Sequence, residues 1–119
     1  MLTLREVLND FALYAKLEPG NVSVNTRSPS GESPIHWMAA LGDVPAIQLL
    51  ANAGADLSVQ DQSGNTALHV AVSAGHGPAT QALIAAGAPV ALRNTLGQTP
   101  EDVAHSFPSA NLAALFAKS

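Results

Sequence analysis

The sequence predicts an all-α solenoid in which antiparallel helix pairs stack side by side, with short turns at their tips and a capping helix at the N-terminus. The first observation behind this prediction is periodicity. Gly31, Gly64 and Gly97 open three similar segments, so a spacing of 33 residues occurs twice. A fixed period of this length indicates a repeat architecture. The second observation is that ten of thirty aligned positions are identical between residues 31–60 and 64–93, including glycine and proline at expected helix ends.

Composition narrows the class of protein. The chain has 119 residues, 47% of them apolar and 4% aromatic, so we expect one domain over residues 1–119 with a core of Ala, Leu, Val and Ile. Because there is no cysteine, disulfides, zinc–thiolate sites and thiol nucleophiles are excluded. The N-terminus lacks a basic segment followed by an apolar run, and no apolar stretch reaches the length of a membrane span. These features favour a cytoplasmic protein.

Residues 1–26 are expected to form a helical N-terminal cap and a loop. One helix is predicted over residues 2–17, because Thr3 and Glu6 have capping-box spacing and apolar residues recur every three or four positions. Pro19-Gly20 is expected to end this helix, since proline and glycine both interrupt the helical backbone. The turn-rich residues 20–30 then lead into the first full unit.

The first full unit is predicted over residues 27–60. A short helix over 34–41 has Ser33 as its cap and proline at its first position, where the missing N–H costs nothing. A second, antiparallel helix over 44–53 ends at Gly54, which we expect in the left-handed conformation. Asp61-Gln62-Ser63-Gly64 is then predicted to form the turn at a hairpin tip.

The second unit, residues 61–93, repeats this plan. Thr66 is expected to cap a helix over 67–74, and Pro78 is expected to begin a helix that ends before Gly87.

The last unit, residues 94–119, is predicted to close the stack. Thr99 caps a helix from residue 100 to about 106, and a final helix is expected over 110–117. Its inward-facing residues are expected to be Leu112, Leu115 and Phe116. An atypical terminal unit is what a solenoid requires, because its outer face has no neighbour.

These units resemble the ankyrin repeat over roughly residues 27–117. The pattern Gly-x-Thr-x-Leu-His-x-Ala, followed by Gly-His, a helix and Gly-Ala, carries the resemblance in the second unit. The matching residues there are Thr66, Leu68, His69, Ala71, Gly75, His76, Leu83, Gly87 and Ala88. In the first unit they are Ser33, Pro34, Ile35, His36, Ala39, Gly42, Leu50, Gly54, Ala55 and Asp56. Residues 99–104 are similar to the version seen in last repeats, where Asp102 replaces the histidine.

The histidines are the candidates for chemistry. His36 and His69 lie one repeat apart, so a stack places them close together. The resemblance implies a structural role, in which each imidazole bonds to the backbone of its own or the adjacent turn. A metal site would need a third ligand, and Asp102 is the only candidate in register. No nucleophile elbow or phosphate-binding glycine loop occurs. We therefore expect no catalytic residue, no metal and no cofactor.

The resemblance implies that partners bind the hairpin tips and the inner face of the first helix of each pair. Carried over by position, the candidate protein-binding residues are Glu32, Trp37, Leu41, Gln62, Ser63, Asn65, Ser73, Leu96, Gln98 and Phe107. Trp37, the only tryptophan, is favoured as core filler over binding anchor. For Leu41, Leu96 and Phe107 two alternatives stand: they line a partner site, or they fold against the stack.

Charge distribution bears on the partner. The net charge is −4, and no Lys or Arg occurs from residue 28 to residue 92. Such a chain is a poor nucleic-acid binder, because phosphate contacts need cations, and it suits a basic protein surface better. The alternative is a merely solubilising surface.

The sequence thus predicts a non-enzymatic protein-binding module, with no nucleic-acid or membrane contact. The alternative implied by the resemblance is an immunity factor or antitoxin, a role that standalone bacterial ankyrin proteins of this size can have; the chain would then occlude a toxic, basic, nuclease-like enzyme. A monomer is expected, with self-association through Leu41, Leu96 and Phe107 as the alternative.

Overall fold

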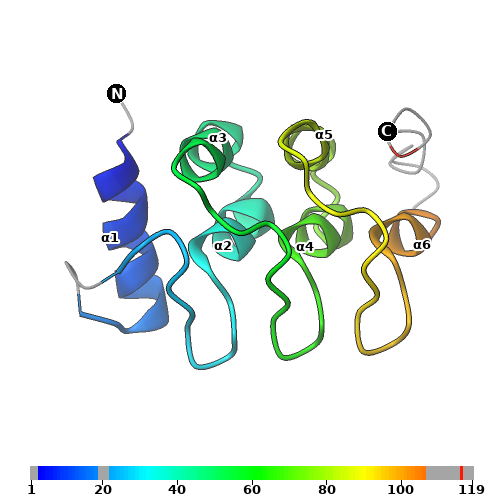
Figure 1. Cartoon of the computed structure of the whole chain (residues 1–119), viewed down its shortest axis with the longest axis horizontal. Helices are drawn as coiled ribbons and strands as arrows, with labels where there is room; N and C mark the ends of the chain where they lie inside the picture. The colour runs from blue at the N-terminus through cyan, green and yellow to red at the C-terminus, as the bar shows by residue number, and fades with distance from the viewer. Residues whose placement is uncertain (1–2, 19–21, 107–115, 117–119) are drawn as a thin grey trace.

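Two rows of helices and one row of hairpins make up the fold (Figure 1). The computed structural model describes residues 3–18, 22–106 and 116. Its helices are α1 (Leu4–Ala15), α2 (Pro34–Leu41), α3 (Val44–Asn52), α4 (Ala67–Ser73), α5 (Gly77–Ala85) and α6 (Pro100–Ala104). Helix α2 packs against α4 and α4 against α6, whereas α3 packs against α5 in the second row. The loops before α2, α4 and α6 all project from the same edge. The predicted all-α solenoid of stacked antiparallel helix pairs is confirmed.

Helix α1 closes the N-terminal end of both rows. It contacts α2 and α3, and it buries Val7 and Phe11 against them. The cap expected at Thr3 is confirmed, because its hydroxyl accepts a hydrogen bond from the N–H of Glu6 at 3.2 Å, and the helix begins at Leu4, two residues after the predicted start. None of the described helices is long and apolar enough to cross a membrane.

The predicted end of α1 is wrong. The helix stops at Ala15, before Pro19-Gly20, because Lys16 adopts the left-handed conformation with φ 59° and ψ 41°. The N–H of Leu17 then bonds to the carbonyl of Ala12 at 2.8 Å, and that of Lys16 to the carbonyl of Leu13 at 3.3 Å. This pair of bonds is the Schellman closure, which satisfies the last carbonyls of a helix. Lysine has no special tolerance for this conformation, so the composition gave no signal for it.

The predicted bounds of α2, residues 34–41, are confirmed, whereas the ends of α3 to α6 differ from the predictions by one or two residues. Helices α3 and α4 end one residue early, α5 begins one residue early at Gly77, and α6 ends at Ala104. The N-caps Ser33, Thr66 and Thr99 are as predicted. The turn expected at residues 61–64 forms, with the N–H of Gly64 bonding to the carbonyl of Asp61 at 2.9 Å. The predicted closing helix, with Leu112 and Leu115, lies outside the described residues apart from Phe116, which is buried.

The core runs through the stack as a single cluster. Leu50 and Leu83, one period apart, are fully buried, and Phe116 occupies the next position in that register. Small residues at the helix contacts, such as Ala39, Ala71 and Ala104, are also fully buried. Because alanine adds little bulk, neighbouring helices approach closely, and the sparse aromatic content suffices to fill the core.

Close contact between successive hairpins leads to a prediction about two glycines. A Cβ added at Gly64, where φ is +75°, would lie 2.8 Å from the backbone nitrogen of Thr95 in the next hairpin. Gly54 has a similar φ of +93°, but a Cβ there would meet nothing within 4 Å. Both alanine substitutions carry the left-handed penalty, roughly 1–2 kcal/mol. We expect Gly64→Ala to cost roughly 1–3 kcal/mol more than Gly54→Ala, because it also forces two hairpins apart.

The measurement is urea unfolding of both variants beside the wild type, followed by circular dichroism. Equal losses in the free energy of unfolding would contradict the close approach of the second and third hairpins.

Candidate functional site

The row of hairpins is joined by side chains that recur at the repeat spacing. In the first hairpin, Arg27 donates from Nε to the carbonyl of Gly31 at 3.1 Å and from Nη2 to the carbonyl of Gln60 at 2.6 Å. One repeat later, Gln60 donates from Nε2 to the carbonyl of Gly64 at 2.8 Å and to that of Arg93 at 2.9 Å. Each of these side chains thus fixes its own turn and also holds the next hairpin.

Backbone hydrogen bonds connect the tips directly. The N–H of Gln62 donates to the carbonyl of Ser30 at 3.1 Å, and the N–H of Thr95 donates to that of Ser63 at 2.9 Å. The side chain of Gln62 adds a bond to the carbonyl of Pro29 at 3.1 Å. Since the tips are bonded to one another as well as to their own turns, their shape is set before any partner arrives.

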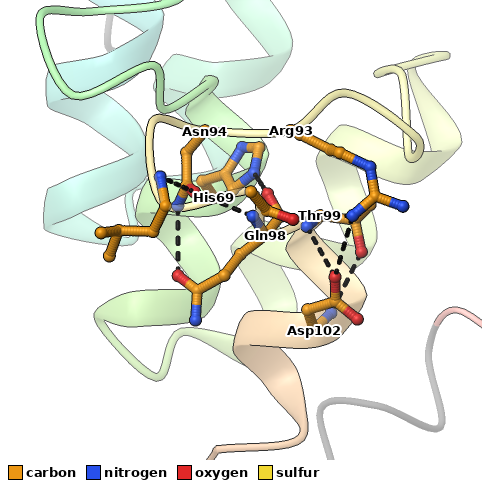
Figure 2. A network of polar contacts seen from close by, with 8 residues as sticks. His69, Arg93, Asn94, Gln98, Thr99 and Asp102 are labelled. Atoms are coloured by element: carbon orange, nitrogen blue, oxygen red, sulfur yellow. Dashed lines mark hydrogen bonds and ion pairs between the residues drawn. The ribbon is translucent and has the colours of Figure 1, made fainter.

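Beneath the tips, two buried histidines connect each first helix to the following hairpin. Nδ1 of His36 faces the N–H of Ser33 at 3.2 Å, and its Nε2 faces the carbonyl of Asn65 at 2.9 Å. His69 repeats this arrangement with the N–H of Thr66 at 3.1 Å. Its Nε2 faces the carbonyl of Gln98 at 2.9 Å (Figure 2). An imidazole nitrogen that faces an N–H must accept, and one that faces a carbonyl must donate, so both rings are assigned as the neutral Nε2–H tautomer.

The environment favours this neutral form. Burial lowers the pKa of His36, and the hydrogen bond to Asn65 and the charges of Asp61 and Glu32 oppose that shift, whereas Arg27 reinforces it. Burial likewise lowers the pKa of His69, with the bond to Gln98 and the charge of Asp61 opposing the shift and His36 reinforcing it. The cause in both cases is the cost of placing a charged imidazole away from water.

The third unit changes the residue at the histidine position. Asp102 accepts a hydrogen bond from the N–H of its own cap, Thr99, at 3.0 Å, and its Oδ2 lies 3.9 Å from Nη1 of Arg93 (Figure 2). The bond from Thr99 is the first cause of a lowered pKa at this carboxyl. An ionised aspartate accepts but cannot donate, so this residue cannot make the bond that His36 and His69 make to a following hairpin.

The comparison with known families covers most of the chain. A family model described as ankyrin repeats (3 copies) matches residues 6–106. The chain belongs to the ankyrin-repeat family. The match begins within α1, whereas the resemblance visible in the sequence starts near residue 27. Ankyrin repeats are generally protein–protein interaction modules and are typically not catalytic. No curated protein matches the chain.

The structural role predicted for His36 and His69 is confirmed, because each imidazole bonds to the backbone of its own cap and of the next turn. Among the described residues, no group of three His, Asp or Glu side chains could hold a metal ion. Both ring nitrogens of His36 and of His69 are already used within the ankyrin stack.

The candidate binding residues fall into two groups. Asn65 and Gln98 supply the carbonyls that the histidines bind, and the Gln62 side chain is bonded within the hairpin row. Besides Gln62, the exposed candidates are Leu41, the last residue of α2, Ser73, the last residue of α4, and Ser63 and Leu96 at hairpin tips, whereas Glu32 and Trp37 are half-buried. Phe107 lies outside the described residues.

For Leu41, Leu96 and Trp37, the structure shows whether each side chain packs against the stack, a question that the sequence left open. Leu41 is 56% exposed and Leu96 is 80% exposed, so neither folds against the stack. Trp37 is half-buried and packs against the core, where the later units place Val70 and Val103. Its ring stacks on Tyr14 of α1 with centroids 5.1 Å apart.

Sequence reasoning missed Arg27, Gln60 and Tyr14. A signal for the first two was present, because long hydrogen-bond donors recur at residues 27, 60 and 93 with the repeat spacing. Tyr14, whose hydroxyl donates to Glu32 at 3.1 Å, had no such signal, since it lies outside the repeats that the sequence aligned.

The buried histidines predict a pH dependence of stability. Their folded-state pKa values lie below the ordinary 6.5, so the unfolded chain takes up protons first as the pH falls. The contribution of these two histidines to the free energy of unfolding is therefore fully present above about pH 6.5. It declines as the pH falls below that value, until the pH reaches the lowered folded-state pKa values. The limiting slope is about 1.4 kcal/mol per histidine per pH unit. Urea unfolding midpoints, measured at several pH values between 8 and 5, give this slope.

The control is His105→Gln, which removes an exposed histidine that lies 3.6 Å from Glu101. We expect it to leave the slope unchanged, whereas His69→Gln, or His36→Gln if the first does not fold, flattens it. A slope that is the same in all variants would show that the buried pair does not titrate on unfolding.

Proposed function

We propose that this chain is a non-enzymatic protein-binding module that holds its partner on the concave side, between the hairpin tips and the C-terminal ends of α2 and α4. The observation that carries the proposal is the pre-ordered hairpin row. The tips are joined by backbone bonds of 2.9–3.1 Å and by the Arg27 and Gln60 side chains. A surface that is already ordered loses little conformational freedom on binding, so modest contact can give useful affinity.

The exposed residues of this surface supply its contacts. Leu96 is held out at a tip whose turn is fixed by Asn94, which accepts from the N–H of Leu96 at 3.0 Å. Leu41 and Ser73 end their helices in solvent. Apolar side chains on a rigid support, flanked by small polar ones, are typical of binding anchors. We assign the binding role to these three residues and Ser63.

The acidic residues between 28 and 92 say less about the chemistry of the partner than the exposed apolar residues do. Three of the four acids between residues 28 and 92 have local roles: Asp43 caps α3, Asp56 holds Ser58, and Asp61 accepts from two amides of its turn. Their presence follows from the fold and needs no basic partner. The alternative function, inhibition of a basic, nuclease-like enzyme, rests on the absence of Lys and Arg from this stretch.

Capture from source-cell lysate tests the proposed surface. The bait is the wild-type chain beside a variant with Leu41, Ser73 and Leu96 all changed to Lys. The matched control changes Gln48, Asn52 and Gln81, exposed residues of α3 and α5, to Lys. We expect a partner that the wild type and the control recover alike and that the concave variant recovers about tenfold less or worse, because buried unpaired lysines oppose docking.

Equal recovery by all three baits would contradict the proposed surface, and loss with the control alone would move it to the outer helices. If the partner is a basic hydrolase, the inhibitor alternative takes first place. Particle size by light scattering tests self-association through Leu41 and Leu96.

A further inference from the structure

A polar depression lies where the end of α1 meets the first hairpin. It is lined by Tyr14 and Lys16 from the end of α1 and by Ser28, Ser30 and Glu32 from the hairpin. Glu32 is the one acid of the cation-free stretch whose carboxylate is held by side chains alone. Both hydroxyls that hold it belong to this depression.

The Glu32 carboxylate is fixed in position. Its Oε1 accepts from the Tyr14 hydroxyl at 3.1 Å and from the Ser30 hydroxyl at 3.0 Å. Ser30 is in turn 3.1 Å from the hydroxyl of Ser28, which also accepts from the N–H of Glu32 at 3.2 Å. Oε2 has only the longer contact of 3.3 Å to Tyr14. A carboxylate oxygen has two acceptor sites, so Oε2 retains capacity for a further donor.

No cation of the described chain neutralises this carboxylate. The described ion pairs are Arg93 with Asp102 and His105 with Glu101. Arg27, the nearest arginine in sequence, directs its guanidinium to the carbonyls of Gly31 and Gln60. Glu32 is therefore a pre-positioned negative charge without a counter-ion in the part of the chain that the structure describes.

Aromatic surface adjoins the carboxylate. The Tyr14 ring stacks on Trp37 with centroids 5.1 Å apart and an interplanar angle of 20°, and 47% of Tyr14 remains exposed. A guanidinium group is planar, always charged and able to donate two parallel hydrogen bonds to a carboxylate while its face lies against an aromatic ring. An ammonium group matches the charge but not the plane or the fork.

We propose that this depression receives an arginine side chain of the partner protein, with the guanidinium bonded to Glu32 and lying against Tyr14. This inference rests on the proposed protein-binding function and names the chemistry of one partner residue. Lys16, which also lines the depression, carries a positive charge near the site, so it limits the affinity for any cation.

The only tryptophan in the chain, Trp37, is a built-in reporter because it stacks on Tyr14. The experiment titrates the whole chain with N-acetyl-arginine amide, N-acetyl-lysine amide and the neutral N-acetyl-citrulline amide, each at constant ionic strength. Binding is followed by Trp37 emission and by the amide NMR shifts of residues 14–16 and 30–32. We expect saturable binding of the arginine amide, at least about threefold weaker binding of the lysine amide, and none of citrulline.

Four variants test the assignment. Glu32→Gln is expected to weaken arginine binding about tenfold or more, since it removes the charge-assisted bonds. Tyr14→Phe keeps the ring but frees the carboxylate, and is expected to weaken binding less. Lys16→Gln removes the opposing charge and is expected to tighten it. Asp56→Asn, a matched loss of an exposed carboxylate elsewhere, is expected to change nothing. Urea unfolding midpoints establish whether each variant is folded. If Glu32→Gln does not fold, the binding measured for Tyr14→Phe and Lys16→Gln tests the assignment instead.

Several results would overturn the proposal: no saturable response in either emission or amide shifts, equal affinity for the lysine amide, or undiminished binding by folded Glu32→Gln. Failure here is distinct from failure of the proposed function. If Glu32→Gln captures the lysate partner undiminished while the variant at Leu41, Ser73 and Leu96 does not, the binding surface stands and the arginine site falls.

Discussion

The hydrogen bond from a buried imidazole to the main chain of the next hairpin is the interaction on which the rest of this stack depends. His36 and His69 are 1% and 0% exposed, so their donor nitrogens have no access to water. Leaving such a group unpaired costs roughly 1–3 kcal/mol. The carbonyls of Asn65 and Gln98 must therefore sit where the rings point. In the described chain no buried side-chain nitrogen or oxygen lacks a partner, so this requirement is met throughout.

That constraint explains how a surface made of turns can be rigid. Once an imidazole fixes the base of the following hairpin, the Arg27 and Gln60 side chains bond to carbonyls at the start of the next hairpin, and the bonds from Gln62 and Thr95 align the tips. The central acids mostly serve these turns and caps, which leaves Glu32 as the one whose carboxylate is held by side-chain hydroxyls alone. A pre-ordered row of hairpins is consequently the feature that best connects this fold to binding.

Local chemistry explains why much of the fold could be predicted. Thr66 and Thr99 cap helices by bonds within one turn, and the glycines supply left-handed backbone at fixed offsets, so residue type alone indicates these features. The end of α1 could not be predicted, because Lys16 adopts a conformation that its residue type disfavours. Distances between units were also inaccessible. The roles of Asn65 and Gln98 in the histidine bonds belong to their main-chain carbonyls, which no residue type encodes, and the Tyr14–Glu32 bond joins parts of the chain that share no pattern.

The most direct test of this account is the protonation state of the two imidazoles, measured by long-range proton–nitrogen NMR on the intact chain at pH 7. The account predicts that both His36 and His69 are neutral, with Nε2 protonated and Nδ1 bare, and that the Nε2 protons exchange slowly with water because they are buried in hydrogen bonds. Nδ1–H tautomers, rapidly averaging rings or charged imidazoles at that pH would contradict it, since none of these states can bond both to the cap and to the next hairpin as the structure requires.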